Sequence, residues 1–286
     1  MSETKGTLYL VSTPIGNLED MTYRAVRVLQ EVHTIAAEDT RHSGLLLKHF
    51  DIKKPLISYH EHNKEVKEEP LLALLLAGHD VALISDAGMP AISDPGAELV
   101  QAAIEAAITV VPLPGPNAAL TALIASGLDT REFTFLGFLP KKSSHRQALL
   151  ERVASYTGTL LFYEAPHRLQ ASLQELYKYL GNRSIVVGRE LTKKFETFVR
   201  TDLASLQQAE DWLTIKGEFV LVVGGAVPDE TRPDTATTLS TTDYVSAVTM
   251  LMEEGIPKKE AIREIAKRTG VSRRDVYNAV EMALRD

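Results

Sequence analysis

The chain has 286 residues, of which 44% are hydrophobic and 24% are charged. This balance is typical of folded globular proteins and excludes a disordered, collagen-like or coiled-coil chain. The length is enough for about two domains with separate cores. The sequence contains no cysteine, which excludes disulfides, thiolate nucleophiles, iron–sulfur clusters and cysteine-ligated zinc.

The sequence shows no membrane-spanning or secretion signal. The longest apolar run, from Leu71 to Ala77, is far too short to cross a bilayer. The first residues, Met1 to Lys5, begin no apolar stretch of the kind found in signal peptides. We therefore expect a cytoplasmic protein with no membrane partner.

The net charge is −7, from 31 basic and 38 acidic residues, which by itself is unusual for a protein that binds nucleic acid. The charge is distributed unevenly. From Pro257 to the end there are eight Lys and Arg and five Asp and Glu, a balance of +3, so the remaining residues carry −10. A basic tail on an acidic body indicates a separate role for the tail.

Short apolar runs alternate with amphipathic segments along most of the chain. One amphipathic segment is Tyr23–Val32, and another follows Asp94, which with Pro95 predicts a capped helix start. The apolar runs are continuous, as in strands covered on both faces. This alternation predicts α/β layers. The runs include Leu8–Val11, Val81–Ile84, Leu160–Tyr163, Ile185–Val187 and Phe219–Val223.

Breaks in this alternation predict four parts. The strand-and-helix pattern restarts at Phe133, which places the first boundary near Gly127–Arg131. A later stretch rich in Pro, Thr and Asp has no apolar periodicity and predicts a linker. The parts are an N-terminal α/β domain over 1–128, a second α/β domain over 129–227, a linker over 228–242 and a small basic helical module over 243–286.

Three short helical stretches make up the module, over Tyr244–Glu254, Lys258–Thr269 and Arg273–Leu284. Turns containing glycine separate them, and Ser272 with Asp275 predicts a capping box at the start of the third. Helix-turn-helix modules are built in this way. With its positive balance, the module is expected to attract phosphate groups and to do no chemistry.

Several widespread motifs are absent from the sequence. It has no G-x-G-x-x-G, no Walker A motif, no G-x-S-x-G and no H-E-x-x-H. The close pair His60 and His62 has no evident third ligand, so we expect no metal site.

The most informative stretch, Ser85 to Gly96, directly follows the apolar run Val81–Ile84 and precedes a helix. Ligands of open α/β sheets bind at the carboxyl ends of strands. Gly88 permits close approach of a ligand to the backbone, and Asp86 can accept hydrogen bonds from an ammonium or hydroxyl group. A plain strand-to-helix connection explains the same residues, so the pattern alone leaves both interpretations open.

Two further turns follow predicted strands in the same way. One lies within VPLPGPNAA at 111–119, where three prolines stiffen the chain. The other is Thr13–Asn17, after the first apolar run. Three such turns at three strand ends predict a single crevice.

Seven blocks, in one order, make the chain similar to the tetrapyrrole-methylase-like class of S-adenosylmethionine-dependent methyltransferases. Within that class they resemble the bacterial branch that methylates small-subunit ribosomal RNA. The resemblance covers about residues 6 to 225. The blocks are LYLVSTPIGNLEDMTYRA at 8–25, AAEDTRHS at 36–43, LISDAGMPAISDPG at 83–96, VPLPGPNAALTALIASGL at 111–128, FLGFLPKK at 135–142, FYEAPHRL at 162–169 and GEFVLVVGG at 217–225.

The resemblance implies two α/β/α domains with S-adenosylmethionine bound in the cleft between them, in a homodimer. It implies methylation of the ribose 2′-oxygen of a cytidine in small-subunit (16S) ribosomal RNA, either free or in the assembled subunit. By family analogy, the donor-binding residues are Pro14, Asp86, Ala87, Gly88, Met89, Asn117, Ala118, Ala119, Glu164, Ala165, Glu218 and Phe219.

A general base would remove the proton of the ribose hydroxyl. Glu164 and His167 are favoured as catalytic residues, because their block lies at a strand end that faces the expected cleft. The alternative is that Glu164 only binds the donor and His167 only packs. The other candidates are Glu38, Asp39, His60 and Glu61.

Contacts with RNA phosphates are expected from basic residues inside the distinctive blocks, near predicted strand ends. An acidic protein that binds RNA must concentrate its positive charge locally. The predicted RNA-binding residues are Arg41, Lys141, Lys142 and Arg168.

The sequence is compatible with two other functions. A small-molecule methylase acting on a tetrapyrrole would use the same crevice, but it needs no basic helical tail. A non-catalytic RNA-binding or ribosome-associated factor would have a damaged donor crevice, whereas the crevice residues here look intact.

Overall fold

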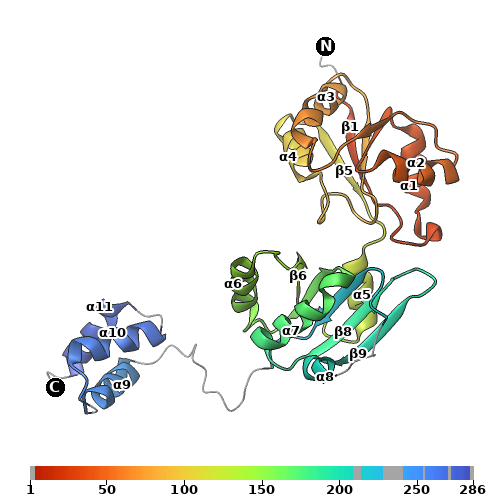
Figure 1. The fold of residues 1–286 in the computed structure, drawn as a ribbon. Helices are drawn as coiled ribbons and strands as arrows, with labels where there is room; N and C mark the ends of the chain where they lie inside the picture. The colour runs from red at the N-terminus through yellow and green to blue at the C-terminus, as the bar shows by residue number, and fades with distance from the viewer. Residues whose placement is uncertain (1–3, 209–213, 228–240, 254, 270–271, 284–286) are drawn as a thin grey trace. The chain divides into compact units, whose positions relative to one another are not determined.

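The computed structural model describes residues 4–208, 214–227, 241–253, 255–269 and 272–283. The chain divides into two compact units, residues 1–226 and 227–286. The first unit contains two five-stranded sheets with helices packed on them (Figure 1). The predicted fold class, layered α/β with a small helical segment at the C-terminus, is confirmed.

The first sheet is parallel, with the strand order β3-β2-β4-β1-β5. Helices lie on both of its sides (Figure 1), which is why strand β4 is buried at every residue and reads as a continuous apolar run. The strands are β1 (Thr7–Val11), β2 (Thr34–Ala37), β3 (Leu56–Ser58), β4 (Val81–Ile84) and β5 (Thr109–Leu113).

Four helices bury the two faces of this sheet. Leu29 and Leu47 lie in the core on one face, whereas Leu75 and Leu99 lie in the core on the other. The first pair comes from α1 (Tyr23–Glu31) and α2 (Thr40–His49), and the second from α3 (Lys64–Leu76) and α4 (Ala97–Glu105). A short 3-10 helix, η1 (Leu18–Asp20), precedes α1.

The second sheet is mixed, with the order β6-β7-β10-β8-β9. Strands β6 and β7 run parallel, and β10 and β8 each pair antiparallel with their neighbours. The strands are β6 (Phe133–Phe138), β7 (Thr159–Glu164), β8 (Ser184–Arg189), β9 (Thr197–Asp202) and β10 (Phe219–Val223). The helices after β6, β7 and β9 are α6 (Ser143–Val153), the pair η2 (Pro166–Arg168) and α7 (Leu169–Leu180), and α8 (Leu203–Gln208).

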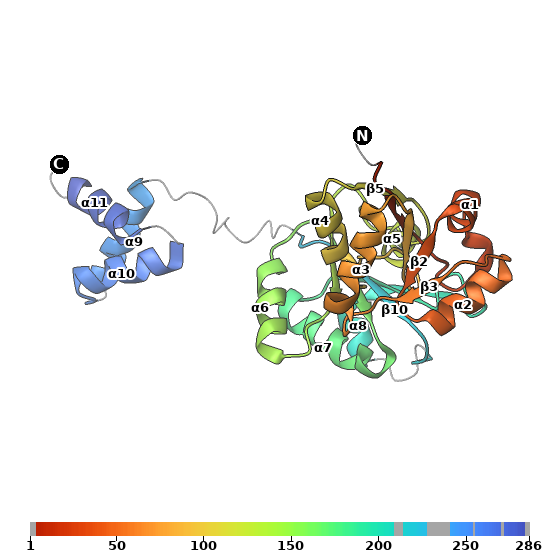
Figure 2. The same cartoon turned by 90° about the horizontal axis from the view of Figure 1, so that it is seen from above.

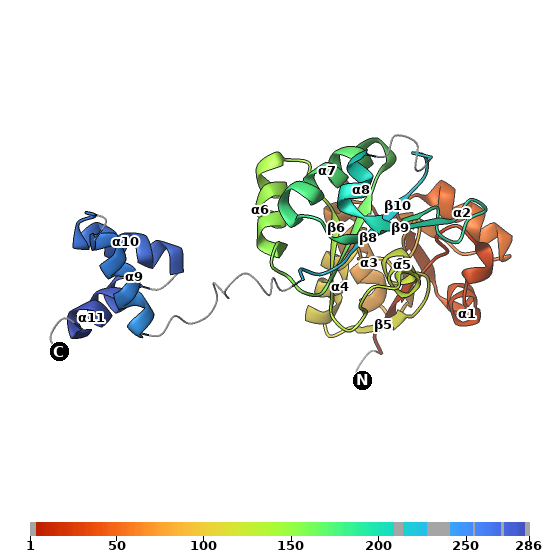
Figure 3. The same ribbon diagram turned by 90° about the horizontal axis from the view of Figure 1, so that it is seen from below.

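Helix α5 (Ala118–Ser126) follows the last strand of the first sheet but packs on the second. Its Ala122 shares a core with Leu161 of β7 and Val222 of β10. Figures 2 and 3 show α5 and α7 on opposite sides of this sheet. The division expected near Gly127–Arg131 therefore falls after a helix whose core contacts lie with the second sheet, because the chain crosses between the sheets before α5.

Helix α4 begins at Ala97, with Gly96 as its N-cap at a φ of 140°. The predicted N-cap, Asp94 followed by Pro95, is therefore wrong. A Cβ atom at position 96 would lie 2.6 Å from a methyl carbon of Leu83, and a positive φ favours glycine. The helix thus starts where Gly96 lies against Leu83 of β4, and the Asp94 carboxylate does not cap it.

The second unit consists of α9 (Thr241–Glu253), α10 (Lys258–Thr269) and α11 (Arg273–Ala283). These helices share a core that contains Val248, Ile262 and Val276. The three predicted helices are confirmed, and α9 begins at Thr241 inside the stretch predicted to be linker.

Residues 228–240 of the predicted linker lie outside the described residues, as does the Asp275 side chain of the predicted capping box. In the parts of the chain that the structure describes, no helix is long and apolar enough to cross a bilayer.

Candidate functional site

A cavity of about 460 Å³ lies in the first unit, between the carboxyl ends of the first sheet and the second sheet. Ten of the twelve residues expected to bind the donor line it. Pro14 lines a neighbouring cavity instead, and Ala119 is buried in the core that α5 shares with the second sheet. The ten are Asp86, Ala87, Gly88, Met89, Asn117, Ala118, Glu164, Ala165, Glu218 and Phe219.

Hydrogen bonds hold together the three turns that were expected to form one crevice. Backbone groups of Thr13 and Gly88 exchange two hydrogen bonds, of 2.9 and 3.0 Å. The Thr13 hydroxyl donates to the carbonyl of Ser85 at 3.0 Å. From the third turn, the Asn117 amide nitrogen lies 3.7 Å from the sulfur of Met89. The parallel arrangement of β1, β4 and β5 places all three turns at the same edge of the sheet.

The loop between β4 and α4 has an unusual backbone. Gly88, Ala91 and Ser93 all have positive φ, at 83°, 65° and 62°. For a residue other than glycine this conformation costs about 1–2 kcal/mol, and such strain concentrates at ligand sites. The same loop brings Ile92, Ser93 and Asp94 to the cavity wall. These residues were not predicted to line the site, although the glycines at both ends of the loop, Gly88 and Gly96, signal an irregular backbone.

Three carboxylates from the first sheet line the cavity: Glu38, Asp86 and Asp94. Burial, together with the negative charge of Asp86, raises the pKa of Glu38. Burial and the charge of Glu38 raise the pKa of Asp94 to about 7. Of the described residues that line the cavity, none is a lysine, an arginine or a histidine. The wall therefore carries negative charge that a cationic ligand would neutralise.

Aromatic and apolar side chains complete the wall. The ring of Tyr163 lies edge to face with that of Phe138, at a centroid distance of 5.7 Å. Burial raises the pKa of the Tyr163 hydroxyl. Phe219 and Val220 at the start of β10 lie on the same wall. Glu218 is turned partly outward, where its carboxylate pairs with Lys193 at 2.7 Å. Such a site, apolar with a few charged groups, is typical of cofactor pockets.

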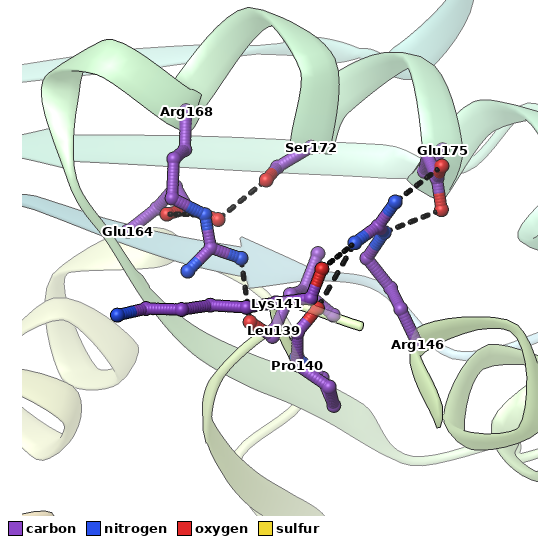
Figure 4. A network of polar contacts seen from close by, with 8 residues as sticks. All are labelled: Leu139, Pro140, Lys141, Arg146, Glu164, Arg168, Ser172 and Glu175. Carbon is purple, nitrogen blue, oxygen red and sulfur yellow. Dashed lines mark hydrogen bonds and ion pairs between the residues drawn. The ribbon is translucent and has the colours of Figure 1, made fainter. Parts of the chain in front are cut away.

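Glu164 ends β7 with a fully buried side chain. One carboxylate oxygen accepts a hydrogen bond of 2.8 Å from the amide of Ala165, and the other accepts one from the hydroxyl of Ser172. The Arg168 guanidinium lies 3.5 Å from the first oxygen (Figure 4). Both oxygens are engaged inside the protein, which argues against Glu164 as the general base.

The other base candidates differ in their relation to the cavity. Glu38 lines it, and His60 is close enough to influence the charge of Glu38. His167 is exposed on η2, and it is not among the residues that line the cavity. Asp39 caps α2 and accepts a hydrogen bond from the amide of Arg41, and Glu61 pairs with Lys64 at 2.9 Å. Of these candidates, Glu38 and Glu164 line the cavity, and both oxygens of Glu164 are engaged within the protein.

The Arg168 guanidinium makes contacts within the protein. Its side chain is 21% exposed, and it donates a hydrogen bond of 2.5 Å to the carbonyl of Leu139. Together with the contact to Glu164, this leaves little of the guanidinium for a phosphate (Figure 4). The prediction that Arg168 binds RNA did not foresee this structural need for a long cation.

The other three cations expected to bind RNA are exposed. The Arg41 side chain on α2 is 90% exposed and pairs with Asp39 at 2.8 Å. Lys141 and Lys142 precede α6 on an exposed turn. Arg146 fixes that turn by donating to the carbonyls of Pro140 and Lys141, at 3.0 and 3.1 Å (Figure 4). The turn thus presents both lysines to solvent from a fixed backbone.

The rings of His60 and His62 lie 6.1 Å apart, edge to face. Across the described ranges, no group of three or more His, Asp and Glu side chains is arranged to hold a metal ion.

The sequence comparisons point to one family. The family model for tetrapyrrole (corrin/porphyrin) methylases matches residues 7–207. The chain is 50% identical, over 283 residues, to the ribosomal RNA small subunit methyltransferase I of Halalkalibacterium halodurans, covering 96% of this chain and 95% of that protein. It is 46% identical to the protein of the same name from Bacillus subtilis, covering 96% and 94%.

Solved structures share the fold at lower identity. The uroporphyrin-III-C-methyltransferase of Thermus thermophilus has a TM-score of 0.56 at 23% identity, covering 78% of this chain and 96% of that chain. A cobalt precorrin-4 methyltransferase also has a TM-score of 0.56, at 18% identity, covering 76% and 94%. At these identities the likeness concerns the fold alone.

Proposed function

Because the chain belongs to the tetrapyrrole (corrin/porphyrin) methylase family, we propose that it is an S-adenosylmethionine-dependent methyltransferase of small-subunit (16S) ribosomal RNA. The acceptor is the ribose 2′-oxygen of a cytidine. The relatives that match nearly the whole chain, including the helical segment beyond residue 240, are named for ribosomal RNA. The observation that carries the proposal is the cavity with three carboxylates at the end of the first sheet, Glu38, Asp86 and Asp94.

The cavity fits the methyl donor by charge and by shape. S-adenosylmethionine carries an ammonium and a sulfonium group, and the carboxylates of Glu38, Asp86 and Asp94 line the cavity that would hold them. The raised pKa values of Glu38 and Asp94 indicate that this charge is poorly compensated within the protein. A bound cation would compensate this negative charge and so favour the ionised carboxylates. Gly88, which has a positive φ, and Phe219 both line the cavity, and an apolar wall at Phe219 would shield the rest of the donor from water.

When bound, the donor supplies a methyl group that its sulfonium has already activated for transfer. The protein therefore has mainly to position the ribose oxygen in line, which can contribute about 7–11 kcal/mol to lowering the barrier. The ribose proton passes to a carboxylate of the cavity wall, and this step can contribute roughly 10²–10⁴-fold in rate. Glu38, Asp86 and Asp94 are the carboxylates at the end of the first sheet that line the cavity. Comparing Glu38→Gln, Asp86→Asn and Asp94→Asn in single-turnover transfer assigns the base.

RNA is recognised outside the cavity. Arg41, Lys141 and Lys142 supply exposed positive charge, and the helical segment from α9 to α11 supplies more. Phosphate contacts of this kind orient RNA without reading its sequence.

The test uses donor labelled in its methyl group, offered with small ribosomal subunits, naked ribosomal RNA or a tetrapyrrole precursor. Label in RNA that resists alkaline cleavage at the modified nucleotide supports ribose methylation, because a 2′-O-methyl group blocks attack on the adjacent phosphate. Label in the pigment identifies a tetrapyrrole methylase. Confirmed donor binding with no transfer to any of the three identifies a non-catalytic RNA-binding factor.

The expected homodimer and cytoplasmic location belong to the same proposal. Leu120 and Ile124 lie one turn apart on α5 and are 44% and 78% exposed, and such an apolar strip is typical of a subunit interface. Light scattering of the purified protein distinguishes a dimer from a monomer. Ribosomal RNA as the substrate supports a cytoplasmic location.

A further inference from the structure

A second cavity, of about 360 Å³, lies beside the donor cavity. The turn after β1 contributes Pro14, Gly16 and the first residue of η1, Leu18. Helix α2 contributes one face. Asp86 lines both cavities, so the two spaces meet at a single carboxylate.

The face of α2 in this cavity is unusual for a helix packed on a sheet. His42, Leu45, Leu46 and His49 follow a spacing of three, four and seven, so they share one side of the helix. The opposite side, with Leu47, packs on the sheet. Leu45 is 71% exposed, and the sheet core does not need it. The helix thus presents two imidazoles and two leucines to an open space.

This surface suits a flat ring with polar edges. Unstacked bases are recognised by stacking on planar and aromatic side chains, histidine included, and by hydrogen bonds to their edges. An imidazole offers both, and a leucine offers a further apolar contact. The volume lies at the lower end of the roughly 300–1,000 Å³ found for small-molecule sites, which suits a single nucleoside.

We propose that the second cavity receives the acceptor nucleoside, with its base against His42, Leu45 and His49 and its ribose at Asp86. This inference rests on the proposed function and names the part of the site that holds the substrate. Because Asp86 is shared, a ribose at this carboxylate lies at the entrance to the donor cavity. Arg41, next to His42 on α2 and 90% exposed, is placed for the adjoining phosphate. The nucleotide must leave its stack to enter, as enzymes that modify nucleic acids commonly require.

The first test reads binding directly from the histidines of the full-length protein. The probe is a single-stranded pentaribonucleotide with a central cytidine, added with S-adenosylhomocysteine present, and the imidazole resonances are assigned with single His→Gln variants. The resonances of His42 and His49 are expected to shift in a saturable way. Those of His33 and His79, which stack on each other at 4.1 Å and do not line the cavity, are expected to stay.

Two results overturn the proposal. In one, the resonances of His42 and His49 do not move although S-adenosylhomocysteine binds. In the other, they broaden with protein concentration and are insensitive to RNA, which would mean that a second copy of the chain covers this face. Neither result depends on methyl transfer, so the pocket is decided separately from the proposed activity.

The second test separates binding from chemistry. His49→Ala removes one stacking ring and is expected to raise the KM for small-subunit ribosomal RNA about tenfold, with the affinity for the donor unchanged. The matched control is His145→Ala on the exposed face of α6, which is expected to change neither constant. An unchanged KM for His49→Ala, in a wild-type background that does methylate RNA, contradicts the pocket assignment and leaves the proposed function standing.

Discussion

The backbone amide of Asp39 donates a hydrogen bond of 3.0 Å to a carboxylate oxygen of Asp86. Asp39 caps α2 after strand β2, and Asp86 lies in the turn after the neighbouring strand β4. The bond fixes the carboxylate that the two cavities share. It also links the start of α2 to the donor cavity, so a change at Asp86 acts on both the donor and the acceptor sides.

Replacing Asp86 by alanine is expected to weaken donor binding without unfolding the protein. A hydrogen bond to a charged group contributes about 1.5–3 kcal/mol, which corresponds to roughly ten- to a hundredfold in affinity. Calorimetry with S-adenosylmethionine measures the change. The matched control is Asp129→Ala, which removes an exposed carboxylate that pairs with Arg131. Equal donor affinity in a folded Asp86→Ala variant would show that this carboxylate does not meet the donor.

Asp94→Asn is expected to stabilise the protein at alkaline pH. The carboxyl of Asp94 has a pKa of about 7 in the folded protein against a reference value of 3.8. Between these values the unfolded chain binds fewer protons than the folded protein, so the free energy of unfolding of the wild type falls as the pH rises. Asparagine does not ionise and escapes this loss. We expect a gain on the order of 1–3 kcal/mol at pH 8 and almost none at pH 4.

Urea unfolding at the two pH values measures this difference for Asp94→Asn. The control, Asp129→Asn, is expected to have the opposite sign at pH 8, because hydrogen bonds from Arg131 lower the pKa of Asp129 to about 2. An equal gain for Asp94→Asn at pH 4 and pH 8 would mean that ionisation is not the cause.

Arg41 and Arg168 were both predicted from the sequence to bind RNA, but their alanine variants are expected to differ in stability and in RNA methylation. Arg41→Ala should lose RNA methylation while the free energy of unfolding and donor binding stay near the wild type, because exposed ion pairs contribute little to stability. Arg168→Ala leaves the buried carboxylate of Glu164 without its cation, and we expect a loss of about 2–4 kcal/mol in the free energy of unfolding.

Thermal unfolding and an RNA filter-binding titration separate the two variants. The control Ser172→Ala removes the other side-chain partner of Glu164 and should lower stability in the same direction as Arg168→Ala. A stable Arg168→Ala variant that binds RNA poorly would instead place this residue on the RNA face.

The sequence predicted several strands whose residues are mostly buried, although β2, which is buried at every residue, was not among the named runs. Strands β4 and β10 read as continuous apolar runs because helices or strands cover every residue. Strand β9 was not among the predicted strands, since it is an edge strand with polar residues in half-exposed positions. The packing of α5 on the second sheet was also missed, because chain order alone does not say which sheet a connecting helix covers.

The residues of the site that were predicted lie in turns whose sequences match the family blocks. Asp94 followed by proline has the local pattern of a helix cap, and only the close approach of Gly96 to Leu83 moves the helix start onward. Likewise, Glu164 looks like an available carboxylate until Arg168, one turn later in η2, folds back on it. Both errors arise because tertiary contacts decide how a polar side chain is used.

Truncation after Pro228 is expected to leave donor affinity near that of the wild type and to weaken binding to small-subunit RNA. Every residue assigned to the donor cavity lies in the first compact unit, which ends at Ala226. The second unit has its own core around Val248 and Val276. The remaining RNA binding should depend less steeply on salt, because fewer phosphates are neutralised.

A full-length variant tests the same idea without truncation. Arg273 and Arg274 at the start of α11 are exposed, and changing both to glutamate should reduce the slope of log affinity against log salt. We expect the magnitude of this slope to fall by about one to two, because each phosphate that the protein neutralises contributes roughly 0.7–0.9 to it. The matched control changes Arg27 and Arg152, two exposed arginines on α1 and α6, and should leave the slope near the wild type. If the α11 variant methylates ribosomal RNA with unchanged apparent affinity from low to high salt, these two arginines do not contact RNA. If the truncated protein also binds RNA normally, the whole helical segment has no part in RNA binding.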